Sequence, residues 1–549
     1  MTAKQPISAK EQSRLCHDYA TFADHHYATL IRSSELERLT AYVDRRQAEL
    51  GQAAQPSSKR KRDSSKSVHT QVQTELEEDQ RAIVELLNEQ NLYVKTALRM
   101  YAAALYTSDD HDDSVTRLLS LWLQHESNED LNKGVSPALE KVPPHKFIFL
   151  GPQLAARLDR PKKPTAFNTV INALLLRMSQ QHPFHILYQI VTLASGMTLP
   201  STSRRLSDSA AEGRGPAAIS IIATLSAENG NTLARMAVKQ MKLFADSASS
   251  WSLHKEAGRD ETSRNHRDVK LPSGCPLASL QNLTIPISTS PPPIDIVSRY
   301  SGVPTLQRYR SRYSVLGGLH RPKKMYAVDS LHRIHPQLFK GEDEVRQDAV
   351  MEQVFEMSNK FLSRDRKTKA RHLRFRTYTV IPLAHKTGVL EFVGDSQGIG
   401  EWLRPAHARY GVTNGDLRSE EFRSILKPIQ EKDENSRELV PKYTKMIQEF
   451  HPVMRHFFTE RHKDPMSWFA MRLSYVRSAA VTSMVGWILG IGDRHCSNIM
   501  IDQITGELVH IDFGIVFEEV SVMKSLYTLL LTSLIREDAF GYPRRSHSG

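Results

Sequence analysis

With 549 residues, 40% of them hydrophobic and 24% charged, the chain has the balance of an ordinary folded protein and a length that predicts roughly two to four domains. No run of about 18 uncharged apolar residues occurs, and the N-terminal segment lacks the apolar core of a signal peptide, which argues against a membrane span and a secretory leader. The net charge of +12 is compatible with nucleic acid, acidic lipid or no specific partner, and it is dispersed along the chain apart from one basic run.

Residues 1–200 are predicted to be mainly helical. In ELLNEQNLYVKTALRMYAAALY (85–106), apolar side chains recur at spacings of three and four, and the pattern returns in residues 112–125 and 167–194. Because short polar turns separate these helices, we expect them to pack in pairs as an α-helical solenoid. No fixed-period repeat accompanies the pattern, so the prediction rests on helix density.

The middle of the chain is predicted to connect two regions of different character. Residues 201–217 have the composition of a loop, and a helix is predicted over about 218–245. The polar segment 251–274 is predicted to be irregular, and the prolines in ISTSPPPIDI (287–296) exclude a helix there.

The remainder of the chain mixes strand and helix patterns. HLRFRTYTVIPL (372–383) and GVLEFVGD (388–395) alternate and are rich in β-branched and aromatic residues, as strands are. DEVRQDAVMEQVFEMSNKFL (343–362) predicts an amphipathic helix, and SWFAMRLSYVRSAAVTSMVGWILG (467–490) predicts a long, mostly buried one. A strand-and-helix segment followed by a helical one predicts a two-lobed α/β domain.

Polar residues that follow the long helix have the pattern of phosphoryl-transfer chemistry. Asp493 and Asn498 lie five residues apart, and Asp512 follows in HIDFG. Such chemistry needs an Asp that orients and deprotonates the attacking hydroxyl, with an Asn and a second Asp that hold magnesium against the phosphates. His495 could stabilise charge on the transferred phosphoryl group. The alternative is a capped helix end with a polar turn, followed by a strand that contains a buried Asp.

A cation for the phosphates is predicted at Lys340, at the end of a strand. Asp343 and Asp348 follow it within the turn and the first helical turns, where a carboxylate can hold the ammonium ready for a nucleotide. Capping of the helix by Asp343 and a favourable dipole interaction of Asp348 are compatible alternatives.

Two further segments are predicted to contact ATP because of their positions in the chain. The turn at Leu316, Gly317 and Gly318 precedes Lys340 by about twenty residues, and its backbone amides could cradle phosphate, although a glycine pair alone is more often a simple turn. The segment 388–395 would join the two lobes, so its backbone could bond adenine. The residues concerned are Leu390, Glu391, Phe392 and Val393.

The basic run KRKR at residues 59–62 has two interpretations, a nuclear import signal or a solvated linker that happens to be basic. No basic stripe with interleaved aromatic residues is evident, so direct nucleic-acid binding is not expected. Cys16, Cys275 and Cys496 are too far apart for a zinc motif or a disulfide framework, and they fit a reducing compartment.

The motifs resemble the phosphatidylinositol 3-kinase-related protein kinases, and the finer match is to the ATM (ataxia-telangiectasia mutated) subfamily with its fungal telomere-maintenance counterpart. FKGEDEVRQDAVMEQVFEMSNKFL, VIPLAHKTGVLEFV and the segment from FHPVMRHFF to GIGDRH are similar to that subfamily's kinase domain. YATFADHHYATLIRSSELE, DDSVTRLLSLWLQH and PPHKFIFLGPQLAARL resemble its helical FAT region. The resemblance covers nearly all of residues 15–519.

The resemblance implies an α-helical FAT-type solenoid followed by a bilobal α/β kinase domain of the PI3K/PI4K type. Residues 1–197 would be the C-terminal part of the FAT region, 198–285 a linker with connecting helices, and 286–519 a kinase domain with an incomplete C-terminal lobe. The family's site roles fall on Lys340 for phosphate, Asp348 as its partner on the helix, Asp493 as catalytic base, His495, and Asn498 and Asp512 as magnesium ligands.

The same resemblance implies ATP with Mg²⁺, or Mn²⁺ in its place, as cofactors. The function it implies is a nuclear serine/threonine protein kinase of the DNA-damage checkpoint, acting at chromosomes and telomeres on Ser or Thr followed by Gln. Damage-site recruiters would bind an N-terminal solenoid that the family has and this chain lacks. A homodimer is expected, and no membrane partner is.

Two departures from the family pattern leave other functions open. The chain starts inside the FAT region, and the match stops after Glu519, where the family continues with an activation segment and a FATC end. Residues 520–549 show no relation to the family, and we interpret them as an artefact of gene prediction. The alternatives are a catalytically incompetent nucleotide-binding scaffold fragment and, less favoured, a phosphoinositide kinase, whose basic activation loop has no counterpart here.

Overall fold

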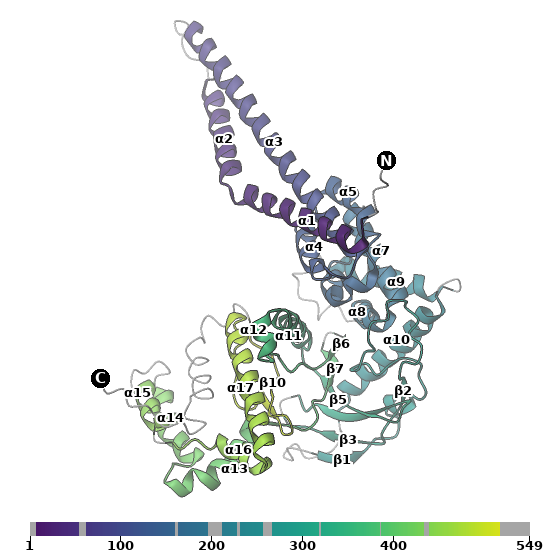
Figure 1. Ribbon diagram of the computed structural model, residues 1–549, viewed down its shortest axis with the longest axis vertical. Coiled ribbons are helices and arrows are strands. Elements are labelled where there is room, and N and C mark those ends of the chain that lie inside the picture. Colours follow the sequence, from purple (N-terminus) through teal and green to yellow (C-terminus); the bar gives the residue numbers. More distant parts are fainter. Residues whose placement is uncertain are drawn as a thin grey trace. The chain divides into compact units, whose positions relative to one another are not determined.

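The computed structural model describes residues 7–53, 62–159, 163–195, 211–227, 231–255, 266–317, 320–384, 386–432, 439–448 and 450–516. The chain forms two compact units, Met1–Lys242 with Pro292–Gly302 and Leu243–Pro291 with Val303–Gly549. The first unit is helical, and the second contains two antiparallel sheets with helices (Figure 1). None of the helices within the described ranges is long and apolar enough to cross a membrane.

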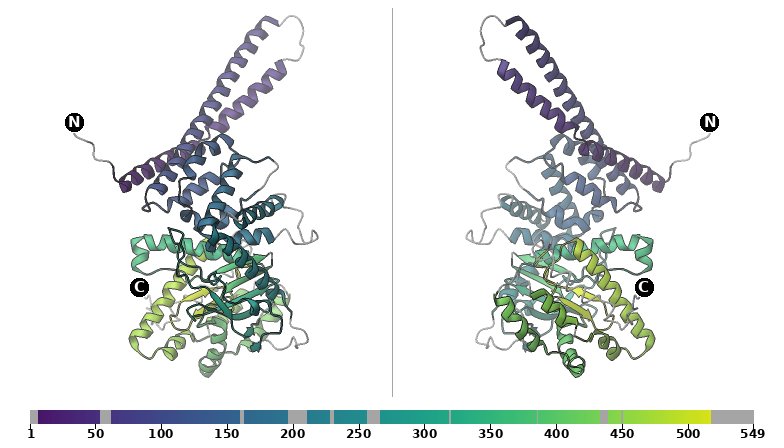
Figure 2. Two further views of the ribbon diagram at one scale, coloured as in Figure 1. Left: turned by 90° about the vertical axis from the view of Figure 1, so that its right-hand side faces the viewer. Right: turned by 90° about the vertical axis from the view of Figure 1, so that its left-hand side faces the viewer.

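The first unit is organised around one long helix, α3, which has 46 residues. Helices α1 and α2 both pack along α3, and α2 and α3 form an extended pair (Figures 1 and 2). The helices described for this unit are α1 (Ala9–Arg32), α2 (Glu35–Ala53), α3 (Arg62–Thr107), α4 (Ser114–Leu123), α5 (Glu129–Leu139), the 3-10 helix η2 (Pro144–Leu150), α6 (Gly151–Ala155), α7 (Ala166–Gln181), α8 (Pro183–Ser195) and α9 (Ala211–Ser226). Helix α10 (Thr232–Leu253) begins in this unit and ends in the second.

Buried polar contacts fix the register of the first helices. Asp24 on α1 is 8% exposed and accepts bonds from Arg117 Nε at 2.6 Å and from the Tyr101 hydroxyl at 3.0 Å. Because an unpaired carboxylate is costly to bury, these bonds favour one arrangement of α1, α3 and α4. Burial and the neighbouring Asp24 raise the pKa of Tyr101 to about 12.

The prediction of a helical solenoid in this region is confirmed, but two boundaries within it are wrong. Helix α9 begins at Ala211, inside the segment predicted as a loop, and residues 201–210 lie outside the described part of the chain. The predicted single helix over 218–245 is two helices. Asn231 separates them because its side-chain Oδ1 accepts from the Leu233 N–H at 2.9 Å and so begins α10.

The second unit contains a seven-stranded antiparallel sheet in the order β1-β3-β4-β5-β7-β6, with β2 paired to β4 beside β3. Its strands are β1 (His266–Lys270), β2 (Leu306–Tyr309), β3 (Arg312–Val315), β4 (Lys323–Asp329), β5 (Ile334–Gly341), β6 (Val380–Ala384) and β7 (Thr387–Glu391). A second, three-stranded antiparallel sheet has the order β10-β9-β8. Its strands are β8 (Ser396–Gly398), β9 (Ile499–Asp502) and β10 (Leu508–His510).

The second unit also contains helices. They are α11 (Arg346–Arg364), α12 (Arg366–Ala370), α13 (Ile399–Tyr410), α14 (Ser419–Lys432), α15 (Leu439–Gln448), α16 (Met454–Arg461) and α17 (Pro465–Ile488), with the 3-10 helices η5 (Pro276–Ser279) and η6 (Val412–Asn414). Of these, α11, α13 and α17 pack against its strands. One apolar core joins Phe355 of α11 and Val481 of α17 to Phe513. A second gathers Trp402, Phe457 and other side chains around β9. These two packed cores support the segments that carry the candidate site residues.

Three predictions for this unit need correction. Strand β1 lies in the segment predicted as irregular, because pairing with β3 stabilises a sequence of low strand propensity. In the predicted strand 372–383, only Val380 onward is a strand, since the Phe375 N–H donates to the Asn359 side chain at 2.7 Å and not to a ladder. Helix α17 buries one face only, and Trp487 on it is 66% exposed. The predicted strand 388–395 and helix 343–362 correspond to β7 and α11.

Candidate active site

The residues between α17 and β9 form a tight loop that carries Asp493 and Asn498. Asp493 has a left-handed backbone with φ 52°, which Asp and Asn tolerate better than most residues. Asn498 Nδ2 donates to the Asp493 carbonyl at 3.0 Å and lies 3.4 Å from Asp493 Oδ2. The structure therefore brings these two predicted residues together, with Asn498 buried and Asp493 exposed.

His495 lies beside Asp493 in the same loop. Its Nδ1 is 3.2 Å from the Ser497 N–H, which can only donate, so Nδ1 accepts and the neutral ring carries its proton on Nε2. Nε2 lies 4.0 Å from Asp493 Oδ1. The loop thus holds a half-exposed imidazole with its N–H beside the carboxylate of Asp493.

Arg494 connects this loop to the segment that contains Asp512. The side chain is 2% exposed, and its Nε donates to the Gly492 carbonyl at 2.7 Å. Nη1 donates to the Ile511 carbonyl at 2.8 Å and Nη2 to that of Asp512. No role for Arg494 was predicted from the sequence, because its burial is set by residues far along the chain. We infer that Arg494 positions the two segments relative to each other.

Replacing Arg494 with methionine should destabilise this region by about 3–5 kcal/mol, because backbone carbonyls that it satisfies would stay buried without a donor. Hydrogen exchange of the β9 and β10 amides measures the loss of local stability. Arg366→Met on α12 removes an exposed arginine and is the matched control, for which we expect a change within about 0.5 kcal/mol. A similar small change at Arg494 would show that the buried bonds carry little energy.

Lys340, near the end of β5, is held by two carboxylates. Its Nζ lies 3.0 Å from Asp343 Oδ2 and 3.4 Å from Asp348 Oδ2. Burial favours the neutral amine, but the two carboxylates outweigh burial and keep the pKa of Lys340 above its ordinary value, so the ammonium is charged at neutral pH. The next residue is Gly341, where a Cβ atom would lie 2.3 Å from the Ser252 carbonyl oxygen, so the close approach of α10 requires glycine.

Asp348 also bonds the segment after β10. Its Oδ1 accepts from the Phe513 N–H at 3.0 Å, while Oδ2 faces Lys340. Asp512, the residue before Phe513, is exposed and has a left-handed backbone with φ 60°. One buried carboxylate on α11 therefore ties the predicted phosphate-binding lysine to the segment of the predicted metal ligand.

The predicted phosphate loop lies only partly within the described residues. Leu316 is half-buried after β3, and its N–H donates to the Pro322 carbonyl at 2.9 Å. Gly317 is exposed, and Gly318 lies outside the described part of the chain. The turn begins at the end of β3, which pairs with Lys323 of β4. Lys323 in turn pairs with Phe339 of β5, the residue before Lys340.

The predicted adenine-binding segment has most of its backbone donors engaged. The Glu391 N–H donates to the Thr379 carbonyl at 2.8 Å and the Phe392 N–H to the Pro336 carbonyl at 3.0 Å. Leu390 lies within β7, paired with Leu338. Across the described residues, the Val393 N–H donates to no partner, so Val393 is the residue of this segment with a donor left for a ligand.

The donor set around Asp512 suits a hard cation that shares its ligands with phosphate. Asn498 and Asp512 offer oxygen ligands, and the Ile511 N–H donates to the Asn498 carbonyl at 3.0 Å, which keeps the two segments paired. Within the described ranges, no group of three or more His, Cys, Asp or Glu side chains could hold a metal by itself. That set fits Mg²⁺, which in nucleotide sites takes one or two protein oxygens and several from phosphate and water.

Comparison with known proteins agrees with this geometry. Residues 335–526 match the family model described as phosphatidylinositol 3- and 4-kinase. Serine/threonine-protein kinase TEL1 of Cryptococcus neoformans var. neoformans serotype D (strain B-3501A) is 42% identical over 94% of this chain and 17% of that protein. Serine-protein kinase ATM of Sus scrofa is 32% identical over 93% of this chain and 17% of that protein.

The solved structure "FAT and kinase domain of CtTel1" has 30% sequence identity and a TM-score of 0.81, covering 94% of this chain and 34% of that one. Over 94% of its length the chain is similar to Tel1 kinases, in sequence and in fold. These similarities confirm the resemblance recognised from sequence motifs and the prediction of a FAT-type helical region followed by a PI3K/PI4K-like kinase domain. The chain spans 17% of the length of these TEL1 and ATM relatives.

Proposed function

We propose that this protein is an ATP-dependent serine/threonine protein kinase. The observation that carries the proposal is the position of Asp348, which bonds Lys340 through one oxygen and the Phe513 N–H beside Asp512 through the other. Helix α11, through Asp348, thereby fixes both Lys340, the predicted cation for phosphate, and the segment of Asp512, the predicted metal ligand. The names of the TEL1 and ATM relatives, both serine or serine/threonine protein kinases, support the same reaction class.

Each residue of the site would have one task in this reaction. Mg²⁺, or Mn²⁺ in its place, would neutralise phosphate charge, and Asn498 and Asp512 would hold it. Lys340 would bind the ATP phosphates through its ammonium, and the Val393 N–H would bond adenine. Asp493 would orient the attacking hydroxyl and accept its proton, with His495 beside it to stabilise charge on the transferred group.

The finer proposal concerns substrates and setting. We propose modification of Ser or Thr followed by Gln, a nuclear role in the DNA-damage checkpoint and at telomeres, and recruitment through regions that Tel1/ATM relatives have beyond this part. A homodimer is also proposed. It is supported by a solved neighbour named "Complete CtTel1 dimer with C2 symmetry", which has 30% identity and a TM-score of 0.80.

Transfer of phosphate from labelled ATP to two peptides tests the proposal. The peptides differ only in carrying Ser-Gln or Ser-Ala, and phosphatidylinositol is offered in parallel. We expect phosphorylation of the Ser-Gln peptide by the 549-residue chain and none of the lipid. Mg²⁺–ATP binding without transfer to any acceptor would favour the nucleotide-binding scaffold, and transfer to the lipid alone would favour a phosphoinositide kinase.

A further inference from the structure

A row of arginines follows the segment from β2 to β3, with Arg308 in β2, Arg312 in β3 and Arg310 in the connection between them. Arg308, Arg310 and Arg312 occupy every second position, and all are exposed. The intervening Tyr309 and Tyr313 are 7% and 3% exposed, so the tyrosines point to the opposite, buried face. Along RYRSRY the charged side chains are therefore exposed and the aromatic rings buried. The charge is thus less dispersed than predicted from the sequence.

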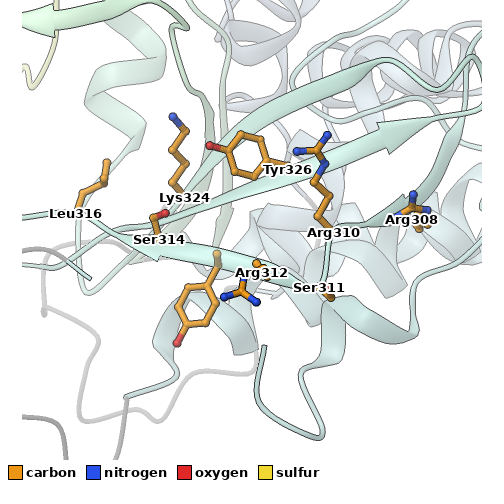
Figure 3. Close-up of a pocket in the computed structure, with 9 residues that line it drawn as sticks. Arg308, Arg310, Ser311, Arg312, Ser314, Leu316, Lys324 and Tyr326 are labelled. Atoms are coloured by element: carbon orange, nitrogen blue, oxygen red, sulfur yellow. The ribbon is translucent and has the colours of Figure 1, made fainter. Parts of the chain in front are cut away.

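Lysine and tyrosine side chains of β4 join this face. Ser314 pairs with Lys324, and Tyr326 lies two residues along the same strand. With the three arginines they line a hollow of about 530 Å³ (Figure 3). Residues that face each other across antiparallel strands share a face, so the hollow is formed by one side of the sheet.

Stacking contacts hold two of the cations in the hollow. The Arg310 guanidinium lies 5.5 Å from the centroid of the Tyr326 ring, and Lys324 Nζ lies 3.5 Å from that of Phe392. Among the described residues, neither Arg308 nor Arg310 forms an ion pair with a carboxylate. A concave surface lined by such cations concentrates anions, and guanidinium groups match the oxygens of phosphate.

The shape of the hollow favours one kind of phosphate. A phosphate monoester is a dianion on a short stalk, and it can enter a compact concavity and meet several guanidinium groups at once. Nucleic acid presents single charges along an extended backbone and stacks its bases on exposed rings. Tyr309 and Tyr313 are buried. Tyr326, whose ring lines the hollow, already has the Arg310 guanidinium and the Lys324 ammonium 5.5 Å from its centroid, so it is occupied by cations and does not offer a base an open face.

The hollow lies on the same face of the sheet as Lys340. Lys324 pairs with Leu338, and Lys340 is two residues farther along β5, about 7 Å away along the strand. The hollow is also lined by Leu316 of the predicted phosphate loop, so a ligand in it would lie on the nucleotide side of the sheet, beside that loop.

We infer that this hollow binds a phosphorylated serine or threonine in a protein segment. This inference rests on the proposed kinase function. The substrates would be proteins that already carry a phosphate near the residue to be modified. The arginines would hold that phosphate while the acceptor hydroxyl reaches the loop at Asp493. No bond forms or breaks in the hollow itself.

Fluorescence anisotropy of a labelled peptide of about ten residues tests this inference with the 549-residue chain. The peptide carries one phosphoserine, its counterpart carries serine, and a saturating non-hydrolysable ATP analogue with Mg²⁺ fills the nucleotide site. We expect the phosphopeptide to bind at least about tenfold more tightly than its counterpart, and inorganic phosphate to compete. Arg308→Gln with Arg310→Gln should weaken it by roughly tenfold or more, whereas Arg366→Gln with Lys369→Gln removes two exposed charges of α12 and should not.

Equal binding of the two peptides, or phosphopeptide binding that survives the double arginine replacement, would overturn the inference. Tighter binding of a single-stranded oligonucleotide through the same arginines would overturn it in favour of nucleic acid. Binding of the ATP analogue, measured separately, distinguishes the two proposals. Loss of phosphopeptide binding alone leaves the kinase proposal intact, and absence of analogue binding contradicts the kinase proposal alone.

Discussion

With Asp493 replaced by asparagine, we expect Mg²⁺–ATP to bind within about threefold of the unaltered chain while phosphoryl transfer falls by roughly 10³-fold. Asparagine tolerates the left-handed backbone at this position and keeps the size of the side chain, so the loop should keep its shape. It cannot accept a proton as a carboxylate does. Calorimetry with a non-hydrolysable analogue measures binding, and single-turnover transfer to the Ser-Gln peptide measures chemistry.

A matched control separates the loss of the Asp493 carboxylate from the loss of any carboxylate in the second unit. Asp246→Asn, at an exposed position of α10, removes a carboxylate elsewhere in the second unit and should leave both binding and transfer unchanged. If the Asp493 variant keeps full transfer, the base lies elsewhere. If it loses nucleotide binding as well, Asp493 contributes to the structure of the nucleotide site and not to proton transfer.

Asp512→Asn should have the second large effect, on metal-dependent binding. The φ of 60° is again tolerated by asparagine, so the change removes charge and not backbone shape. We expect the affinity for the Mg²⁺–ATP analogue to fall by roughly 30-fold or more, because a carboxylate ligand is lost beside several phosphate charges. Measured without Mg²⁺, the two chains should bind the analogue almost equally. An equal loss with and without Mg²⁺ would mean that Asp512 does not act through the metal.

The proximity of the candidate site residues could be predicted from sequence spacing because they lie on short segments. Asp493 and Asn498 share one loop of six residues, and Lys340 and Asp348 are joined by a strand end and a helix start. Local chain geometry alone places such residues near each other. The pairing of Lys340 with both predicted carboxylates follows from that geometry.

Contacts between distant segments could not be predicted. Arg494 bonds carbonyls of residues 511 and 512, and Asp348 bonds the Phe513 N–H. Neither contact has a signature in residue type or spacing, because tertiary packing decides which carbonyl or amide meets the side chain. The same reason explains β1, whose strand conformation depends on its partner β3.

The row of arginines was missed for a different reason. Its period of two is present in RYRSRY, but a net charge counts residues without regard to the face of the strand. The pairing of β3 with β4 places Lys324 beside the arginines, and together these residues line the hollow. The charge pattern of a sequence therefore locates a basic surface only after the pairing of the strands is known.

Calorimetric titration of the 549-residue chain with a non-hydrolysable ATP analogue, with and without Mg²⁺, tests the central claim most directly. That claim is that Lys340, Asp348, Asn498 and Asp512 form one magnesium–nucleotide site. The account predicts one binding site per chain, tighter with Mg²⁺, and weakened roughly 30-fold or more by Lys340→Met because the phosphates lose their ammonium. Absence of binding, or binding that neither Mg²⁺ nor Lys340→Met affects, would contradict it.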